Sequence, residues 1–361
     1  MNRWHVLVAL AVGNAVAHAG SSVLSAVLPL LKAEFRFSDT ELGLLTGYAS
    51  AVSFAVLAIP IARLSQRYGK SLVLTLSTLI YGIAIALTGA CTALWQLVAM
   101  RFIASVGPAA AWPVGQALIC DHFAPQRRSG ALAVHTAGDF AGSTLPLIAG
   151  GWIAARYGWR AAFLTFAVAA IVIALIQWRV VRDRPAAVAA DSMAEAPTTL
   201  PWRAAAAALI RRRSYLHIVL GFSWASFAVA GLSHWMPSFY NRQFGLAPGA
   251  AAAMFGGAYA FGALLGLVAG GWLGNWLARR DPARLVVFCM LTYLCTFPCI
   301  ALVFFAPNLK VAFAAHVAAT MFGSMPNGPL FALIHNSVPA ALRALASSLF
   351  LLTMTLLGGG G

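Results

Sequence analysis

The sequence predicts an all-α membrane protein, and its composition and its apolar runs carry this prediction. Of its 361 residues, 61% are hydrophobic and only 9% are charged, whereas about a quarter of the residues of a soluble domain are charged. Continuous apolar runs reach the roughly 20 residues that an α-helix needs to cross the hydrocarbon core of a bilayer. A membrane β-barrel would show short alternating segments instead. We therefore expect a bundle of membrane-spanning helices.

Eleven apolar runs have the length of a membrane-spanning helix. The first of them is too long for a cleaved signal peptide, so we expect it to remain as the first helix. The predicted spans are residues 4–31, 39–62, 71–93, 94–119, 131–155, 159–181, 214–240, 247–278, 283–306, 308–337 and 344–361.

The 24 Lys and Arg residues predict the orientation of these spans. With the N-terminus in the cytoplasm, seventeen of them fall in cytoplasmic segments and six in segments on the other side. Arg101 alone lies inside a span. Basic residues favour the cytoplasmic side of membrane proteins, so we expect a cytoplasmic N-terminus, in the inner membrane of a bacterium. The net charge of +15 then indicates contact with anionic lipid headgroups rather than with nucleic acid.

One long polar stretch divides the chain. Residues 182–213 are rich in Arg, Pro and Ala and predict a cytoplasmic linker with a short surface helix. We expect an N-terminal bundle of six helices over residues 1–181 and a C-terminal bundle over residues 214–361. The end of span two (ARLSQR, residues 62–67) and the end of span eight (GWLGNW, residues 271–276) are offset by 209 residues. Such an offset indicates two parallel repeats of six helices, and it places a twelfth helix beyond residue 361, which leaves the second bundle incomplete.

Several local strings resemble the major facilitator superfamily, most closely its spinster-like branch and less closely its organic-anion symporters. They include residues 32–35 (KAEF), 38–47 (SDTELGLLTG), 59–64 (IPIARL), 150–163 and 328–346, with Arg101 followed by Gly107 and Pro113. The resemblance implies the major facilitator fold of two pseudo-repeated six-helix bundles. It also implies alternating-access transport of a small molecule, with spans one, four, seven and ten around the central cavity.

The chain departs from the family where the family carries acids. Gln66 and Asn275 replace the Asp of the two loops that follow spans two and eight. Pro108 replaces the Glu of span four, and Gly20 falls where span one has an Asp. Each change removes a carboxylate, so the coupling chemistry that the resemblance implies cannot rest on these positions.

Two charged residues remain inside the spans and are candidates for function. A charge near the bilayer centre costs at least about 2.5–3.5 kcal/mol, and Arg101 and Asp139 are placed there. His135 precedes Asp139 by one helical turn, so the two could share a proton; we predict Asp139 and His135 as the coupling pair. Alternatively, hydroxyl groups of a neighbouring helix hold Asp139 in a structural role. We do not expect a direct contact with Arg101, because it should lie roughly 15 Å away along the membrane normal.

Polar residues recur at helical spacing on spans one, four and ten. A polar face on these spans is what a water-accessible pathway requires, although hydrogen bonds between helices would also enrich polar residues. The predicted substrate-cavity residues are Asn14, His18, Ser21, Arg101, Ser105, Trp112, Gln116, His316 and Asn327.

The sequence favours a secondary active transporter over an enzyme. We find no Ser–His–Asp set, phosphate-binding loop or metal-ligand pattern, and we expect neither a cofactor nor a metal. The five cysteines lie in or beside apolar helices and fit small buried hydrophobes. The predicted substrate is an organic solute, amphipathic or anionic, with protons as a possible partner. The alternative is a transport-inactive membrane binding or regulatory protein derived from a transporter.

Overall fold

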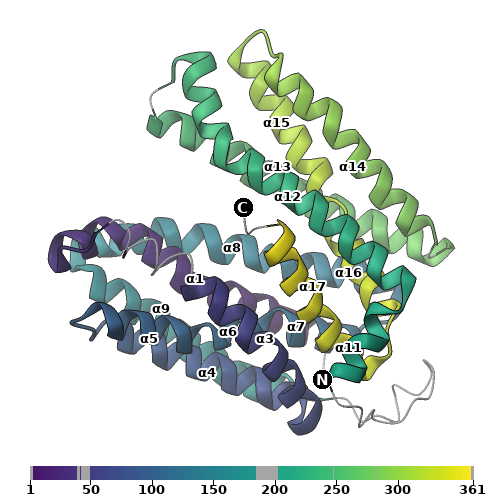
Figure 1. The fold of residues 1–361 in the computed structure, drawn as a ribbon, viewed down its shortest axis with the longest axis horizontal. Coiled ribbons are helices and arrows are strands. Elements are labelled where there is room, and N and C mark those ends of the chain that lie inside the picture. The colour runs from purple at the N-terminus through teal and green to yellow at the C-terminus, as the bar shows by residue number, and fades with distance from the viewer. Residues whose placement is uncertain are drawn as a thin grey trace. The chain divides into compact units, whose positions relative to one another are not determined.

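The computed structural model describes residues 3–38, 41, 49–183, 202–246, 248–281 and 283–358, and every regular element within these ranges is a helix (Figure 1). In chain order the elements are α1 (Arg3–Phe35), α3 (Ala49–Tyr68), α4 (Lys70–Thr88), α5 (Leu94–Ala104), α6 (Val106–Ala111), α7 (Pro113–His122), α8 (Pro125–Tyr157), α9 (Trp159–Val180), α11 (Trp202–Ile210), α12 (Arg213–Phe244), α13 (Pro248–Arg280), α14 (Ala283–Phe304), α15 (Leu309–Ser324), α16 (Asn327–Asn336), the 3₁₀ turn η2 (Ala340–Leu342) and α17 (Arg343–Gly358).

Two of the predicted spans are broken inside the protein. Span four consists of α5, α6 and α7, with breaks at Ser105 and Trp112. Span ten consists of α15 and α16, with the break at Met325 and Pro326. Proline lacks the amide hydrogen of the helical ladder and clashes with the preceding turn, so Pro108, Pro113 and Pro326 account for these breaks. Irregular backbone at membrane depth is tolerated where it is buried in protein or lines a cavity.

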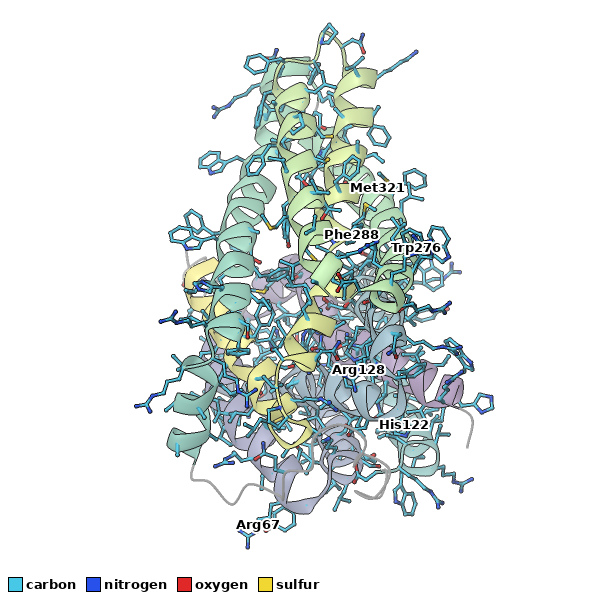
Figure 2. All side chains as sticks on the ribbon, turned by 90° about the vertical axis from the view of Figure 1, so that its right-hand side faces the viewer. Arg67, His122, Arg128, Trp276, Phe288 and Met321 are labelled. Atoms are coloured by element: carbon cyan, nitrogen blue, oxygen red, sulfur yellow. The ribbon has the colours of Figure 1, made fainter. Side chains whose placement is uncertain are left out.

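Seven of the described helical segments are long and apolar enough to cross a membrane. Their large apolar side chains face outward, as lipid-facing surfaces require. Phe305 is 84% exposed and Trp272 is 69% exposed. Figure 2 shows Trp276 on such an outer surface, where the Arg280 guanidinium lies 4.1 Å from its ring centroid. A basic side chain beside an exposed Trp is typical of a membrane–water interface.

Contacts divide the chain into two compact units. Unit 1 comprises Met1–His122, Ala137–Ala206 and Pro339–Leu349. In this unit α4 packs against α9, and α1 packs against α9 and α6. Its apolar core joins side chains of α1, α4, α5 and α9, with Phe163, Leu31 and Leu97 fully buried.

Unit 2 comprises Phe123–Thr136, Ala207–Val338 and Phe350–Gly361. Here α13, α14 and α15 run side by side (Figure 1). A Cβ at Gly266 or Gly270 of α13 would come within 2.2 Å or 1.9 Å of a backbone oxygen of the α15 side. Small residues at these positions therefore permit the close packing of α13 on α15. The predicted domain boundaries at residues 181 and 214 stay a prediction, since residues 184–201 of the linker lie outside the described ranges.

Candidate functional site

Two glycines bring α8 against α1 and create the central pair of the site. A Cβ at Gly138 would come within 2.2 Å of the Ala11 carbonyl oxygen, and one at Gly142 within 2.0 Å of the Ala15 oxygen. Only glycine permits this approach of the two backbones. As a result Asp139 of α8 faces His18 of α1, with 3.3 Å between Oδ1 and Nε2. The Asp139 and His18 side chains are 24% and 28% exposed.

Arg101 meets the same face of α1. Its Nη2 donates to Ser21 Oγ at 3.1 Å, and the whole residue is only 6% exposed. Ser105 lies one turn further along and donates its hydroxyl to the Arg101 carbonyl oxygen at 2.9 Å. Ser21 and His18 are three residues apart, which is about 4.5 Å along a helix axis. Arg101 and Asp139 therefore contact residues of α1 that lie about one turn apart, without a direct contact between the two being required.

Three further predicted residues surround this face of unit 1. Asn14 lies on α1 and is fully buried. Trp112, at the break between α6 and α7, meets the His18 ring edge to face at 6.3 Å between centroids. Gln116 is fully buried and accepts a hydrogen bond from the Ser347 hydroxyl of α17 at 3.2 Å. Within unit 1, the predicted polar faces of spans one and four therefore do face each other.

The remaining predicted residues belong to unit 2. His135 is fully buried, and the structure gives Asp139 a different imidazole neighbour, His18. His316 is 3% exposed, and its Nδ1 lies 2.9 Å from the Tyr240 hydroxyl. Asn327 begins α16 and is half-buried. In the described part of the chain, no three His, Cys, Asp or Glu side chains gather as metal ligands would.

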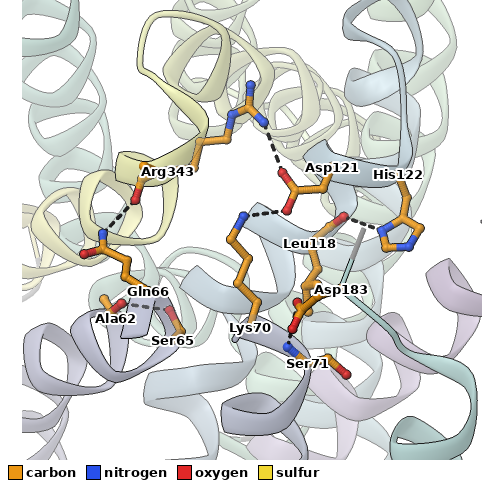
Figure 3. A network of polar contacts seen from close by, with 11 residues as sticks. Ala62, Ser65, Gln66, Lys70, Ser71, Leu118, Asp121, His122, Asp183 and Arg343 are labelled. Atoms are coloured by element: carbon orange, nitrogen blue, oxygen red, sulfur yellow. Dashed lines mark hydrogen bonds and ion pairs between the residues drawn. The ribbon is translucent and has the colours of Figure 1, made fainter. Parts of the chain in front are cut away.

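A second polar cluster lies where α4, α7 and α17 meet in unit 1 (Figure 3). Asp121 Oδ2 lies 2.5 Å from Lys70 Nζ, and its Oδ1 accepts from Arg343 Nη1 at 3.2 Å. Beside it, Gln66 Nε2 donates to the Ala341 carbonyl oxygen at 2.7 Å. One carboxylate thus joins two cations from distant parts of the sequence. We call Lys70, Asp121, Arg343 and Gln66 the Asp121 cluster.

Unit 2 contains a cluster of the same design. Arg128, in the first turn of α8, hydrogen-bonds through Nη1 to Asn336 Oδ1 at the end of α16. Asn275, near the C-terminal end of α13, accepts at its Oδ1 from the Gly130 amide at 2.9 Å. We call Arg128, Asn336, Asn275 and Gly130 the Arg128 cluster.

The comparisons with known proteins decide the family. The model of the Major Facilitator Superfamily matches residues 10–361. The chain belongs to the major facilitator superfamily. An MFS-type efflux pump of Mycolicibacterium smegmatis is 28% identical over 99% of this chain and 82% of that protein. The cis,cis-muconate transport protein of Acinetobacter baylyi is 25% identical over 72% of this chain and 63% of that protein.

A solved structure agrees with this assignment. The bacterial homologue of the human lysosomal transporter spinster, in an inward-facing and unoccupied conformation, aligns with a TM-score of 0.63 and 24% identity, covering 99% of this chain and 80% of that one. The predicted fold and the predicted likeness to spinster-like proteins are confirmed. The chain is an integral membrane protein that transports a solute, as the members of this superfamily do.

The packing of α1 on α4 explains why this chain has Gly20 where the family carries the Asp of span one. At Gly20 a Cβ would come within 2.4 Å of the Ile85 side chain and 2.8 Å of the Tyr81 hydroxyl. The Gly20 amide donates to that hydroxyl at 2.7 Å. An Asp at this position would displace the Tyr81 ring, so the carboxylate of span one is incompatible with this packing of α1 on α4.

Sequence reasoning missed the contacts of the Asp121 cluster. Lys70 and Arg343 entered only as basic residues that set the orientation. The signal that could have found them is Asp121 itself, since it is an acid at the end of a span in a chain with 24 basic and 9 acidic residues. Its partners come from residues 51 and 222 positions away, and the sequence does not indicate which of the many cations it meets.

Proposed function

We propose that this chain transports an organic carboxylate by alternating access, with Arg101 as the group that binds the anion. One observation carries the proposal: the Arg101 guanidinium lies inside a predicted span, is buried, and donates to Ser21 Oγ of α1. A guanidinium presents donors in a planar fork that matches a carboxylate. Its neighbours Ser21 and Ser105 and the more distant amides of Asn14 and Gln116 would supply the uncharged part of the site in unit 1.

The comparisons support a carboxylate as substrate class. One relative is named for the transport of cis,cis-muconate, a carboxylate. A cavity that holds Arg101 and few acids attracts anions and repels cations. A sugar carries no charge, so it would gain less from Arg101 than an anion would.

Counterflow in proteoliposomes tests this function. Vesicles loaded with unlabelled cis,cis-muconate are diluted into trace labelled muconate, and we expect rapid uptake that unlabelled xylose inside does not support. Arg101→Gln removes charge-assisted hydrogen bonds worth about 1.5–3 kcal/mol, so half-saturation should rise roughly 10- to 100-fold. Arg101→Lys keeps the charge and should lose less.

Controls separate binding from folding. Arg67→Gln removes an exposed cation and should leave exchange unchanged. Each variant is checked for a monodisperse elution profile and an unaltered melting temperature in detergent. Wild-type vesicles that exchange no carboxylate would contradict the proposal and favour a binding or regulatory protein without transport activity.

We further propose that the N-terminus, the 182–213 linker and the Asp121 and Arg128 clusters face the cytoplasm of a bacterial cell, in contact with anionic lipid. The seventeen-to-six distribution of basic residues supports this orientation. In a chain whose five cysteines are replaced by alanine, a membrane-impermeant maleimide should label Ser38→Cys from outside the cell. Tyr68→Cys should stay unlabelled until the membrane is opened, and the reverse pattern would overturn the orientation.

A further inference from the structure

We propose that His18 and Asp139 form a single proton site, and that this site takes up one proton when a carboxylate binds at Arg101. The inference rests on the proposed function and deepens it, because it names the coupling ion and the residues that carry it. It replaces the pair expected from the sequence, in which Asp139 would share its proton with His135.

Geometry favours His18 as the partner of Asp139. The imidazole and the carboxylate come from different helices and lie 3.3 Å apart. Both side chains are partly exposed, so the pair is less enclosed than His135. His135 is fully buried, which leaves it without direct access to solvent.

Among the described residues of unit 1, few other titratable groups lie on the elements that pack against this pair. α5 carries Arg101, and α4 carries Tyr81, whose hydroxyl accepts a hydrogen bond from the Gly20 amide. His135 lies one turn before Asp139 in the sequence of α8. α9 carries Arg160 and Arg179 only at its two ends, and α7 carries Cys120, Asp121 and His122 only at its final turn. Trp112, which contacts the His18 ring, does not titrate.

Helix α1 connects the proton site with the anion site. His18 contacts Asp139 and Ser21 contacts Arg101, and the two contact residues are separated by three positions on one helix. A movement of α1 on substrate binding therefore acts on both sites.

Charge balance sets the number of protons. Without substrate, the cation of Arg101 and the anion of Asp139 cancel if His18 is neutral. A carboxylate group at Arg101 adds one negative charge, and a proton on the His18–Asp139 pair restores neutrality. Uncompensated charge is costly at membrane depth, so the loaded site is most stable with one added proton.

Proton uptake on binding is the direct test. Purified protein in weakly buffered detergent solution is titrated with cis,cis-muconate while a pH indicator reports the bulk proton concentration. We expect about one proton taken up per muconate bound, because the charge balance applies to the one carboxylate group that binds at Arg101, and the second carboxylate group of muconate lies outside it. Asp139→Asn should bind muconate and take up none. His18→Gln should lower the uptake severalfold, whereas His122→Gln, which alters an imidazole outside the site, should match the wild type.

Transport provides the second measurement. In proteoliposomes, a pH gradient should drive muconate accumulation by the wild-type protein. Asp139→Asn and His18→Gln should lose accumulation but retain counterflow, because exchange needs no net proton movement. Failure of counterflow in the wild type refutes the proposed function and with it this inference.

Three outcomes overturn the proton site while leaving carboxylate transport intact. The first is counterflow without any proton uptake in the wild type. The second is normal uptake and accumulation in Asp139→Asn. The third is loss of uptake in His135→Gln with normal uptake in His18→Gln, which would assign the proton to the buried histidine.

Discussion

The Asp121 cluster of unit 1 and the Arg128 cluster of unit 2 place equivalent contacts at equivalent points of the two repeats, with different chemistry. Arg343 begins α17 and reaches Asp121 at the end of α7; Arg128 begins α8 and reaches Asn336 at the end of α16. In both, an arginine in the first turn of one helix binds an acceptor at the end of another. Unit 1 uses a carboxylate and adds a second cation, Lys70, whereas unit 2 uses an amide.

Two side-chain amides, Gln66 and Asn275, also occupy equivalent positions in the two repeats, but one acts as a hydrogen-bond donor and the other as an acceptor. Gln66 and Asn275 are 209 positions apart and occupy the place of an acid in the family. Gln66 donates through its nitrogen to the Ala341 carbonyl, but Asn275 accepts through its oxygen from the Gly130 amide. The two repeats therefore share the position of each contact but differ in the chemical groups that make it. A carboxylate at position 275 could still accept from the Gly130 amide. A carboxylate at position 66 could not donate to the Ala341 carbonyl oxygen.

The largest expected effect comes from neutralising the Asp121 cluster. Asp121→Asn copies the acceptor of unit 2 but removes the carboxylate that Lys70 and Arg343 contact. Breaking a mostly buried ion pair from one side costs about 3–5 kcal/mol, and the partial exposure of Lys70 reduces this. We expect the melting temperature in lipid nanodiscs to fall clearly. The double variant Asp121→Asn with Lys70→Met should recover part of the loss; an unchanged melting temperature in the single variant would show that the charge is not needed.

Gln66 donates to Ala341, whereas Asn275 accepts from Gly130. Replacing the amide by a carboxylate should therefore have opposite effects at the two positions. Gln66→Glu keeps the acceptor for Arg63 Nη1 but loses the donor to Ala341 and places an anion beside a carbonyl oxygen. We expect a loss of about 1–3 kcal/mol, which the contact with Arg63 partly offsets. Asn275→Asp keeps the acceptor for Gly130 and should be neutral or slightly stabilising. Denaturation midpoints of the matched variants check this, and equal effects at the two positions would break the comparison.

A charge can also be added to the Arg128 cluster. Asn336→Asp gives the buried Arg128 a carboxylate partner and makes unit 2 resemble unit 1. We expect a stabilisation of no more than about 1 kcal/mol, because an ion pair gains little once desolvation is included. Thermal unfolding at low and high salt measures it. Destabilisation by this change would indicate that the surroundings of Arg128 disfavour an anion.

The smallest effect is expected at an exposed ion pair. Glu34 accepts from Arg160 Nη2 at 2.8 Å and from Trp159 Nε1 at 2.6 Å, and these hydrogen bonds lower the pKa of its carboxyl. The pair therefore stabilises the fold above the ordinary pKa of 4.5 and loses this contribution as the pH falls through the lowered value. Glu34→Gln should shift the melting temperature only slightly at pH 7. The shift should vanish in strong acid, and a shift as large as that of Asp121→Asn would contradict this ranking.

The sequence by itself determined the class of fold and the family. Apolar run length and the scarcity of charge require membrane helices, and the 209-residue offset identified the repeat. It also identified Arg101 and Asp139, since charge inside an apolar span stands out without any structure. The broken form of spans four and ten was not predicted, although Pro108, Pro113 and Pro326 were visible, because proline alone does not say whether a helix bends or ends.

The tertiary structure alone decided the partners. His135 is near Asp139 in the sequence, yet the contact belongs to His18, because Gly138 and Gly142 let α8 approach α1 closely. Arg343 and Lys70 meet one carboxylate although 273 positions separate them along the chain. Helical spacing defines which residues share a face of one helix, but which faces meet depends on the packing of small residues between helices that are distant in sequence.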